Sequence, residues 1–233
     1  MGETLTPEQV VENALKEGCN SIAYTYTEPT IFYEYAYDTA RLARKKGLKN
    51  VMVTNGYINQ EPLKKLYRYI DAANVDLKGF TEKFYKEITS SSLAPVLETL
   101  KTINKMENCW LEITNLVIPA LNDDMKTIKE MCVWLKENLG DSVPLHFSRF
   151  FPFYKLEHLP PTPPETLIKA RKIALGTGLK FVYVGNILLE NSENTYCPKC
   201  RELLIERIGF AVTKNKIKDG KCSCGEIMPG IWK

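Results

Sequence analysis

Polar and charged residues follow the short apolar segments of this chain, where they could bind a charged ligand. Glu28 stands before Pro29 after the first such segment, and Thr54, Asn55 and Gly56 follow the second. A carboxylate or backbone carbonyl at residue 28 can accept hydrogen bonds from a ligand ammonium group. A glycine at residue 56 lets the backbone approach a ligand closely. This pattern favours a holder for a charged cofactor over a general acid-base site.

Two later strand ends add further charged groups. Asp76 and Lys78 are two residues apart, so both side chains point to the same side of an extended segment. They could serve a ligand or form a self-contained ion pair. His146 and Arg149 lie on or just after the fifth apolar segment. A single histidine on a strand is a core residue more often than a catalyst, but here it joins other polar strand ends.

The sequence gives little support for a hydrolytic active site. The chain has only two histidines, and no Ser-His-Asp or Cys-His set can be assembled from the pattern. A catalytic metal held by histidines would need a third ligand. Asn122 and Asp123 follow the fourth apolar segment, where with Asp124 they are interpreted as a turn that caps the next helix.

Four cysteines near the carboxyl end have the spacing of a metal site. Cys197 and Cys200 form one pair, and Cys222 and Cys224 form a second pair after 21 intervening residues. Closely spaced thiols in a chain without secretion signals hold a metal more often than they form disulfides. Residues 203–217 have the pattern of a β-hairpin, so a zinc-ribbon-like structure is expected. Zinc is favoured, and an iron-sulfur cluster or an empty site remains open because C-x-C departs from the usual C-x-x-C.

Composition limits the remaining functions. The 233 residues carry a net charge of +3 without a long run of one sign, so nucleic acid is not an expected partner. We find no apolar run that could span a membrane and no signal-peptide core, so we expect a cytoplasmic protein that does not bind membranes. Cys19, Cys109 and Cys132 stand singly and are interpreted as structural thiols.

Apolar segments alternate with amphipathic helices along most of the chain. Helices are expected at 7–16, 31–46, 60–70, 93–106, 124–139 and 164–175, and strands at 21–27, 50–54, 72–77, 111–118, 145–150 and 181–184. This alternation predicts an α/β fold with parallel strands. A βα-barrel is favoured over an open doubly wound sheet, because there is no G-x-G-x-x-G and polar residues are shared among most strand ends.

The chain opens on a helix, so the barrel is expected to lack its first strand and to leave a sheet edge unpaired. Two domains are predicted, a barrel at 1–190 and a four-cysteine ribbon at 191–233. The exposed edge predicts association or poor solubility of the isolated chain.

Taken in order, these segments resemble a known enzyme family. Residues 24–29, 54–56, 76–78, 116–123, 146–152 and 183–186, followed by the cysteine ribbon, are similar to the radical S-adenosylmethionine (SAM) enzyme of the AmmeMemoRadiSam system, which is related to pyruvate formate-lyase activating enzymes. The resemblance implies a partial (β/α)6 barrel. It also implies reductive cleavage of SAM to a 5'-deoxyadenosyl radical that abstracts hydrogen from an unknown substrate.

The resemblance also implies roles for individual residues. Tyr26, Thr27 and Glu28 match the motif that holds the methionine amino group. Thr54, Asn55 and Asp76 match cofactor-lining positions, Lys78 is suited to the methionine carboxylate, and His146 to the ribose. Val53 stands where related activases often carry Asp, which questions any cation site there. Functional ties to AMMECR-type and Memo-type proteins are implied as well.

One family feature is absent from these residues. The C-x-x-x-C-x-x-C loop that binds the 4Fe-4S cluster does not occur, and Cys197, Cys200, Cys222 and Cys224 have the wrong spacing to replace it. We therefore expect this chain alone to be incompetent in radical chemistry, with the loop lost through a truncated sequence, a fragmented gene or a misplaced start codon. The alternatives are a non-catalytic SAM- or partner-binding barrel and, less favoured, an aldolase or isomerase that uses Lys78 as a Schiff base.

Overall fold

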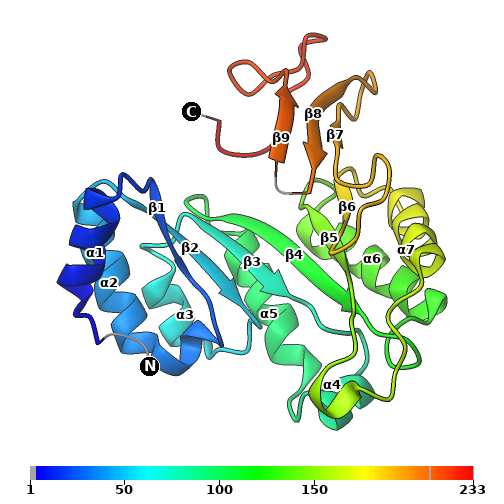
Figure 1. Ribbon diagram of the computed structural model, residues 1–233, viewed down its shortest axis with the longest axis horizontal. Coiled ribbons are helices and arrows are strands. Elements are labelled where there is room, and N and C mark those ends of the chain that lie inside the picture. Colours follow the sequence, from blue (N-terminus) through cyan, green and yellow to red (C-terminus); the bar gives the residue numbers. More distant parts are fainter. Residues whose placement is uncertain (1–3, 210, 233) are drawn as a thin grey trace. The chain divides into compact units, whose positions relative to one another are not determined.

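The computed structural model describes residues 4–209 and 211–232 (Figure 1). The chain divides into two compact units, one formed by the chain up to Leu77 with Ser92–Glu112, and one formed by Lys78–Ser91 with the chain from Ile113 onward. The predicted α/β class is confirmed, since six parallel strands follow one another in the order β1-β2-β3-β4-β5-β6. The predicted domain boundary at residue 190 stays a prediction.

The first unit begins with a helix whose start is encoded locally. The Thr6 hydroxyl accepts a hydrogen bond from the backbone N–H of Gln9, and the Gln9 side chain accepts one from the N–H of Thr6. This reciprocal capping satisfies two N–H groups that a helix start leaves unpaired. The elements of this unit are α1 (Pro7–Lys16), β1 (Ser21–Tyr24), the 3-10 turn η1 (Pro29–Phe32), α2 (Tyr33–Lys45), β2 (Lys49–Thr54), α3 (Gln60–Leu66), β3 (Ala72–Asp76), α5 (Leu93–Asn104) and the start of β4 (Trp110–Val117).

A buried amide holds the first three strands in register. Asn50 accepts a hydrogen bond from the Tyr24 hydroxyl, and its amide nitrogen donates to the carbonyls of Ala40 and Tyr69. Its backbone N–H donates to the carboxylate of Asp71. Because buried polar groups are costly unless they are paired, this network fixes one arrangement of β1, β2 and the turn before β3.

The second unit carries the remaining parallel strands and the antiparallel sheet. Asp124 caps its longest helix by accepting hydrogen bonds from the N–H and hydroxyl of Thr127. The unit contains the rest of β4 and the elements α4 (Glu82–Ile88), α6 (Met125–Leu139), β5 (Leu145–Arg149), the 3-10 turn η2 (Tyr154–Leu156), α7 (Pro164–Gly176), β6 (Val182–Gly185), β7 (Thr195–Tyr196), β8 (Leu203–Ile208) and β9 (Ala211–Asn215). The last three strands form the antiparallel sheet at the upper part of Figure 1.

A buried threonine, Thr162, lies in the proline-rich connector 160–164 between β5 and α7 and bonds to the ends of two strands. The Thr162 hydroxyl donates to the carbonyl of Val117 at 2.6 Å and accepts from the N–H of Phe150. Arg149 donates from Nε to the Thr162 carbonyl. This connector is therefore held against the ends of β4 and β5.

Differences from the predicted elements are local. The seven-residue helix α4 was not predicted, β1 ends at Tyr24, and α3 ends at Leu66. Cys109 and Cys132 are buried as expected, but Cys19 is exposed, so the structural interpretation of that thiol is wrong. It sits in the turn between α1 and β1, outside any apolar face. Among the helices of the described residues, none combines the length and apolar character that a bilayer crossing requires.

Candidate functional site

Glu28 is the centre of the polar group at the ends of β1 and β2. One carboxylate oxygen, Oε1, accepts hydrogen bonds from the N–H and hydroxyl of Thr30 and, at 2.6 Å, from the hydroxyl of Thr54. The other oxygen, Oε2, accepts from the backbone N–H of Asn55 at 2.7 Å. The structure thus brings Glu28, Thr54 and Asn55 together, as the sequence pattern predicted.

This carboxylate keeps the capacity to bind a cation. Glu28 is only partly buried, and no lysine or arginine of the described residues pairs with it. A carboxylate oxygen can accept two hydrogen bonds, and Oε2 accepts one from the chain. The free acceptor capacity of Oε2 therefore fits an ammonium group as the remaining hydrogen-bond donor. Tyr26 and Thr27, joined by a cis peptide bond, are both exposed beside it.

Gly56 allows the turn after β2 to pack closely on β3. Its φ is +71°, and a Cβ atom there would lie 2.7 Å from Cγ1 of Val75. The N–H of Gly56 donates to the Thr54 hydroxyl, which itself donates to Glu28. The predicted need for glycine is thus a packing requirement that holds Thr54 in place.

Asp76 and Lys78 lie at and just beyond the end of β3. Both are partly exposed, whereas Val75 before them and Leu77 between them are fully buried. Burial therefore alternates along these four residues, and the predicted common side of Asp76 and Lys78 stays a prediction. Asp76 belongs to the first unit and Lys78 to the second.

Asn122 has a role that the sequence did not reveal. Its side-chain amide donates to the carbonyl of Lys78 at 2.7 Å and to that of Leu116 at 2.8 Å. Its oxygen accepts from the N–H of Ile118 at 2.6 Å. The helix cap is supplied by Asp124, whereas Asp123 accepts from the N–H of Ala120 within the turn. Asn122 therefore anchors the backbone of Lys78 to the end of β4.

His146 lies in a row of side chains that crosses three strands. It pairs in register with Thr114 on β4 and Tyr183 on β6. The rings of His146 and Tyr183 stack with their centroids 5.1 Å apart and their planes 26° from parallel. The Tyr183 hydroxyl lies 3.0 Å from that of Thr195, and the guanidinium of Arg207 lies 5.8 Å from the Tyr183 ring centroid. The stack fixes the plane of the imidazole.

The four predicted metal ligands converge. The sulfur atoms of Cys197, Cys200, Cys222 and Cys224 all lie within 4.8 Å of one another. The Cys197–Cys224 and Cys200–Cys222 sulfur distances are 3.7 and 3.6 Å. Burial acts to raise the pKa of the Cys197 thiol, but backbone hydrogen bonds from Cys200 and Lys199 outweigh it and lower that pKa to about 7. A four-cysteine metal-binding site is therefore present.

The ligands are supported by apolar packing and by one carboxylate. Cys197 and Cys222 belong to a buried cluster with Phe181, Leu204 and Met228. Glu202 accepts hydrogen bonds from Lys216 and from Ser223, which stands between Cys222 and Cys224. Such outer contacts orient metal ligands.

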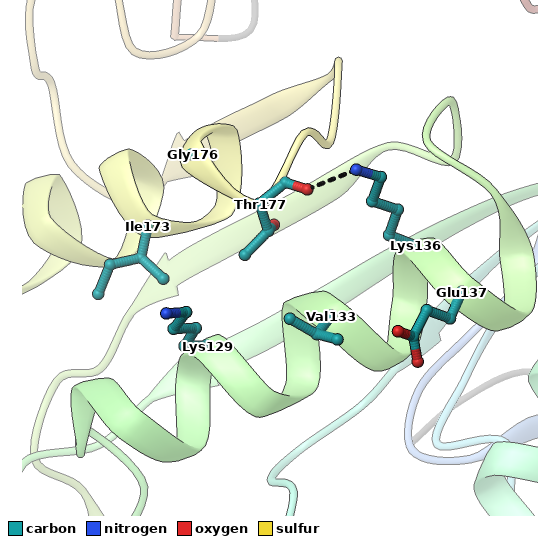
Figure 2. Close-up of a pocket in the computed structure, with 7 residues that line it drawn as sticks. All are labelled: Lys129, Val133, Lys136, Glu137, Ile173, Gly176 and Thr177. Atoms are coloured by element: carbon teal, nitrogen blue, oxygen red, sulfur yellow. Dashed lines mark hydrogen bonds between the residues drawn. The ribbon is translucent and has the colours of Figure 1, made fainter.

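A groove in the second unit is lined by none of the predicted site residues. It is formed between α6 and α7 and has a volume of about 640 Å³, and a hydrogen bond from Lys136 to the carbonyl of Thr177 links its two sides (Figure 2). Its walls combine Val133 and Ile173 with charged side chains at the surface. It has no grouping of acids, bases or metal ligands that would indicate chemistry.

Comparison with known proteins decides the family. A model of the radical SAM superfamily matches residues 2–132, more than half of the chain. The chain belongs to the radical SAM superfamily.

Two curated relatives of this radical SAM protein differ in closeness. It is 48% identical over 225 residues to an uncharacterized protein of Methanocaldococcus jannaschii, a match that covers 95% of this chain and 66% of that protein. It is 22% identical over 149 residues to the (2S)-3-sulfopropanediol dehydratase activating enzyme of Klebsiella oxytoca, covering 61% of this chain and 46% of that enzyme. The chain therefore spans slightly under two thirds of the first relative and less than half of the second.

Solved structures share the fold. A domain of pyruvate-formate lyase-activating enzyme from Bacteroides vulgatus is 16% identical, with a TM-score of 0.61, and the match covers 72% of this chain and 99% of that one. A radical SAM methyltransferase from Sphaerobacter thermophilus is 13% identical, with a TM-score of 0.62, and the match covers 79% of this chain and 59% of that one.

Membership of the superfamily implies that SAM and an iron-sulfur cluster are bound. The residues of this chain fit SAM but not the cluster. Glu28 offers a carboxylate without a cationic partner, which fits the ammonium group of SAM. The seven cysteines do not fit the cluster, because four are gathered in the C-terminal site, Cys109 and Cys132 are buried, and Cys19 stands alone. The described residues therefore offer a carboxylate that fits an ammonium group, but the seven cysteines offer no ligand set for the reducing cluster.

Proposed function

We propose that this chain is the SAM-binding part of a radical SAM enzyme related to the activating enzymes. When SAM and a reduced cluster are bound, such an enzyme generates a 5'-deoxyadenosyl radical that abstracts hydrogen from its substrate. In this proposal the cluster ligands come from outside the 233-residue chain. The Glu28 carboxylate carries the proposal, because four chain donors hold it while no cation among the described residues neutralises it.

In this proposal, each chain group has a binding task. Oε2 of Glu28 accepts a hydrogen bond from the methionine ammonium group, while Thr54 and Asn55 keep the carboxylate in place. Lys78 binds the methionine carboxylate and His146 the ribose, tasks that rest on the family resemblance. Asn122 positions the backbone from which Lys78 projects. The proposal places the reaction in the cytoplasm, where thiols stay reduced.

SAM titration by isothermal calorimetry tests these tasks. A hydrogen bond to a charged group contributes about 1.5–3 kcal/mol, so we expect Lys78→Ala to weaken SAM binding roughly 10- to 100-fold. Lys83→Ala, at an exposed lysine of α4, is the matched control and should bind as the unmodified chain does. Equal affinity of both variants would contradict the role of Lys78.

Glu28 needs a separate test, because it also holds the chain together. Glu28→Gln should lower both SAM affinity and the melting temperature, whereas Glu34→Gln, at an exposed residue of α2, should change neither. A loss of melting temperature without any loss of affinity would show that Glu28 is structural only.

The alternative is a barrel that binds SAM or a partner without catalysis. The absence of cluster ligands among the seven cysteines favours it. The intact mass of the protein from its native source separates the two functions. A mass several kilodaltons above the 26.6 kDa of this chain supports the enzyme, and an equal mass supports the binding protein.

We propose zinc for the four-cysteine site. Four sulfurs bonded tetrahedrally to one zinc ion at about 2.3 Å lie about 3.8 Å from each other, close to the 3.6 and 3.7 Å found for two of the pairs. A 4Fe-4S cluster places each thiolate on a different iron, which requires a wider spacing. Elemental analysis should find one zinc per chain, and iron with visible absorption would overturn this assignment.

We further propose functional ties to AMMECR-type and Memo-type proteins, supported by the ordered resemblance along the whole chain. Affinity purification of the tagged protein from its native source tests this. If neither protein type is recovered, whether or not cell extract is added during the purification, the proposal is contradicted.

A further inference from the structure

A small basic pocket lies where α7, the start of β6 and the first metal-binding turn meet, within the second unit. Its volume is about 100 Å³. Three of its lining residues are cationic and none is acidic. The lining residues are Arg171, Leu175, Lys180, Phe181, Val182, Tyr183, Asn194, Tyr196 and Arg201.

The charge of Arg171 is held at the pocket without a compensating anion. Its Nε donates to the carbonyl of Val182 at 3.0 Å, which fixes the plane of the guanidinium. Among the described residues no carboxylate pairs with it. Burial lowers the pKa of Arg171, and the nearby phenols of Tyr196 and Tyr183 partly offset this effect. Its terminal N–H groups remain as donors for a ligand.

Arg201 supplies a second guanidinium from the metal-binding turn. It follows Cys200 directly, and its backbone N–H donates to the carbonyl of Cys197 at 3.0 Å. Its φ of +65° turns the chain at this point. The described carboxylates make no ion pair with it either.

The third cation is partly neutralised. Lys180 forms an ion pair with Asp141 at 3.0 Å, and both side chains are about 40% exposed. The uncompensated charge of the pocket therefore comes from the two arginines. Paired guanidinium groups are the usual recognition elements for phosphate, because their N–H groups match two oxygens at once.

We propose that this pocket binds a phosphate group, held between the guanidinium groups of Arg171 and Arg201. The volume suits one tetrahedral oxyanion rather than a large ligand. The group could be free phosphate or the phosphomonoester end of a larger molecule. Because Arg201 follows a metal ligand, the site is complete only when the turn around Cys197 and Cys200 is folded.

Calorimetric titration of the metal-loaded chain with inorganic phosphate, at constant ionic strength, tests the proposal. We expect saturable binding with one phosphate per chain. Arg201→Gln should weaken it roughly tenfold or more, because a charge-assisted contact contributes about 1.5–3 kcal/mol. Lys172→Gln removes the same charge at an exposed position of α7 outside the pocket and should leave binding unchanged.

A second variant and a second ligand complete the test. Arg171→Gln should also weaken binding, and its circular dichroism spectrum checks that the fold persists without the hydrogen bond to Val182. Phenyl phosphate that binds as tightly as phosphate would assign the site to a phosphomonoester, and binding of phosphate alone would assign it to the free anion. No saturable binding of either, or equal weakening by Lys172→Gln, would overturn the proposal.

Discussion

The side-chain amide of Asn122 donates a hydrogen bond to the backbone carbonyl of Lys78, 2.7 Å away, and a second one to that of Leu116 at 2.8 Å. The segment after β3 and the end of β4 are therefore joined by one side chain. Asn122 therefore fixes the backbone from which the Lys78 side chain projects, which is what the proposed binding role of Lys78 would require.

Replacing Asn122 should lower both the free energy of unfolding and the proposed affinity for SAM. Asn122→Ala leaves the N–H of Ile118 and the carbonyls of Lys78 and Leu116 without this partner. Each buried group left unpaired costs about 1–3 kcal/mol, so the free energy of unfolding measured in urea should fall by at least that amount. Asn59→Ala removes an exposed asparagine without a side-chain cap bond and serves as the control.

Substitutions at two glycines with similar φ values can distinguish the cost of backbone strain from the cost of steric crowding. Gly18 and Gly56 have φ values of +67° and +71°, but a Cβ at Gly18 would meet nothing within 4 Å, whereas at Gly56 it would meet Val75 at 2.7 Å. Gly18→Ala should cost about 1 kcal/mol for the left-handed backbone. Gly56→Ala should cost about 1–3 kcal/mol more, because overpacking adds to the strain. Urea unfolding of both variants measures the difference, and equal losses would contradict the close packing.

Buried thiols should make the fold sensitive to alkaline pH. Burial raises the pKa of Cys109 and of Cys132 to about 12, whereas a cysteine in the unfolded chain ionises near pH 8.5. The unfolded state loses these protons first, so the free energy of unfolding should fall as pH rises from about 8.5 toward 12. Cys132→Ala should make this fall shallower, and Cys19→Ala, at an exposed thiol, should not.

Removal of the metal should unfold the C-terminal sheet before the parallel strands. Cys197 and Cys222 are part of the apolar cluster that includes Phe181 and Leu204, so loss of the ion leaves four thiols crowded within 4.8 Å and loosens that cluster. With a strong chelator, hydrogen exchange should rise first in β7, β8 and β9. Uniform exchange along the chain after chelation would show that the site does not stabilise this sheet.

Local signals in the sequence predicted the elements well where caps were explicit. Helix α1 has the expected bounds, and its start is encoded by Thr6, Pro7 and Gln9. Helix α4 was not predicted, although Thr81 caps it by accepting a hydrogen bond from the N–H of Phe84. Its length is not the reason, because α3 also has seven residues and was predicted.

For the candidate site, the sequence indicated residues but gave no signal for the hydrogen bonds among them, and the cofactor-binding role of these residues stays a prediction. The polar strand ends indicated Glu28, Thr54 and Asn55, and the structure joins them by hydrogen bonds of 2.6 and 2.7 Å. The tie from Asn122 to Lys78 spans 44 residues, and the stack of His146 on Tyr183 depends on the register of β5 and β6. Neither relation has a local signal, because both are set by the tertiary packing of strands.

The contact between Tyr183 and Thr195 limits how this protein can be engineered. Thr195 stands two residues before Cys197, and its hydroxyl lies 3.0 Å from that of Tyr183, whose ring stacks on His146. Phe181, directly before the strand β6 that carries Tyr183, is buried with the metal ligands Cys197 and Cys222. The cysteine ribbon is therefore not an interchangeable module. A chimera that takes its ribbon from a relative would have to take β6 with it, or lose the wall against which His146 is held.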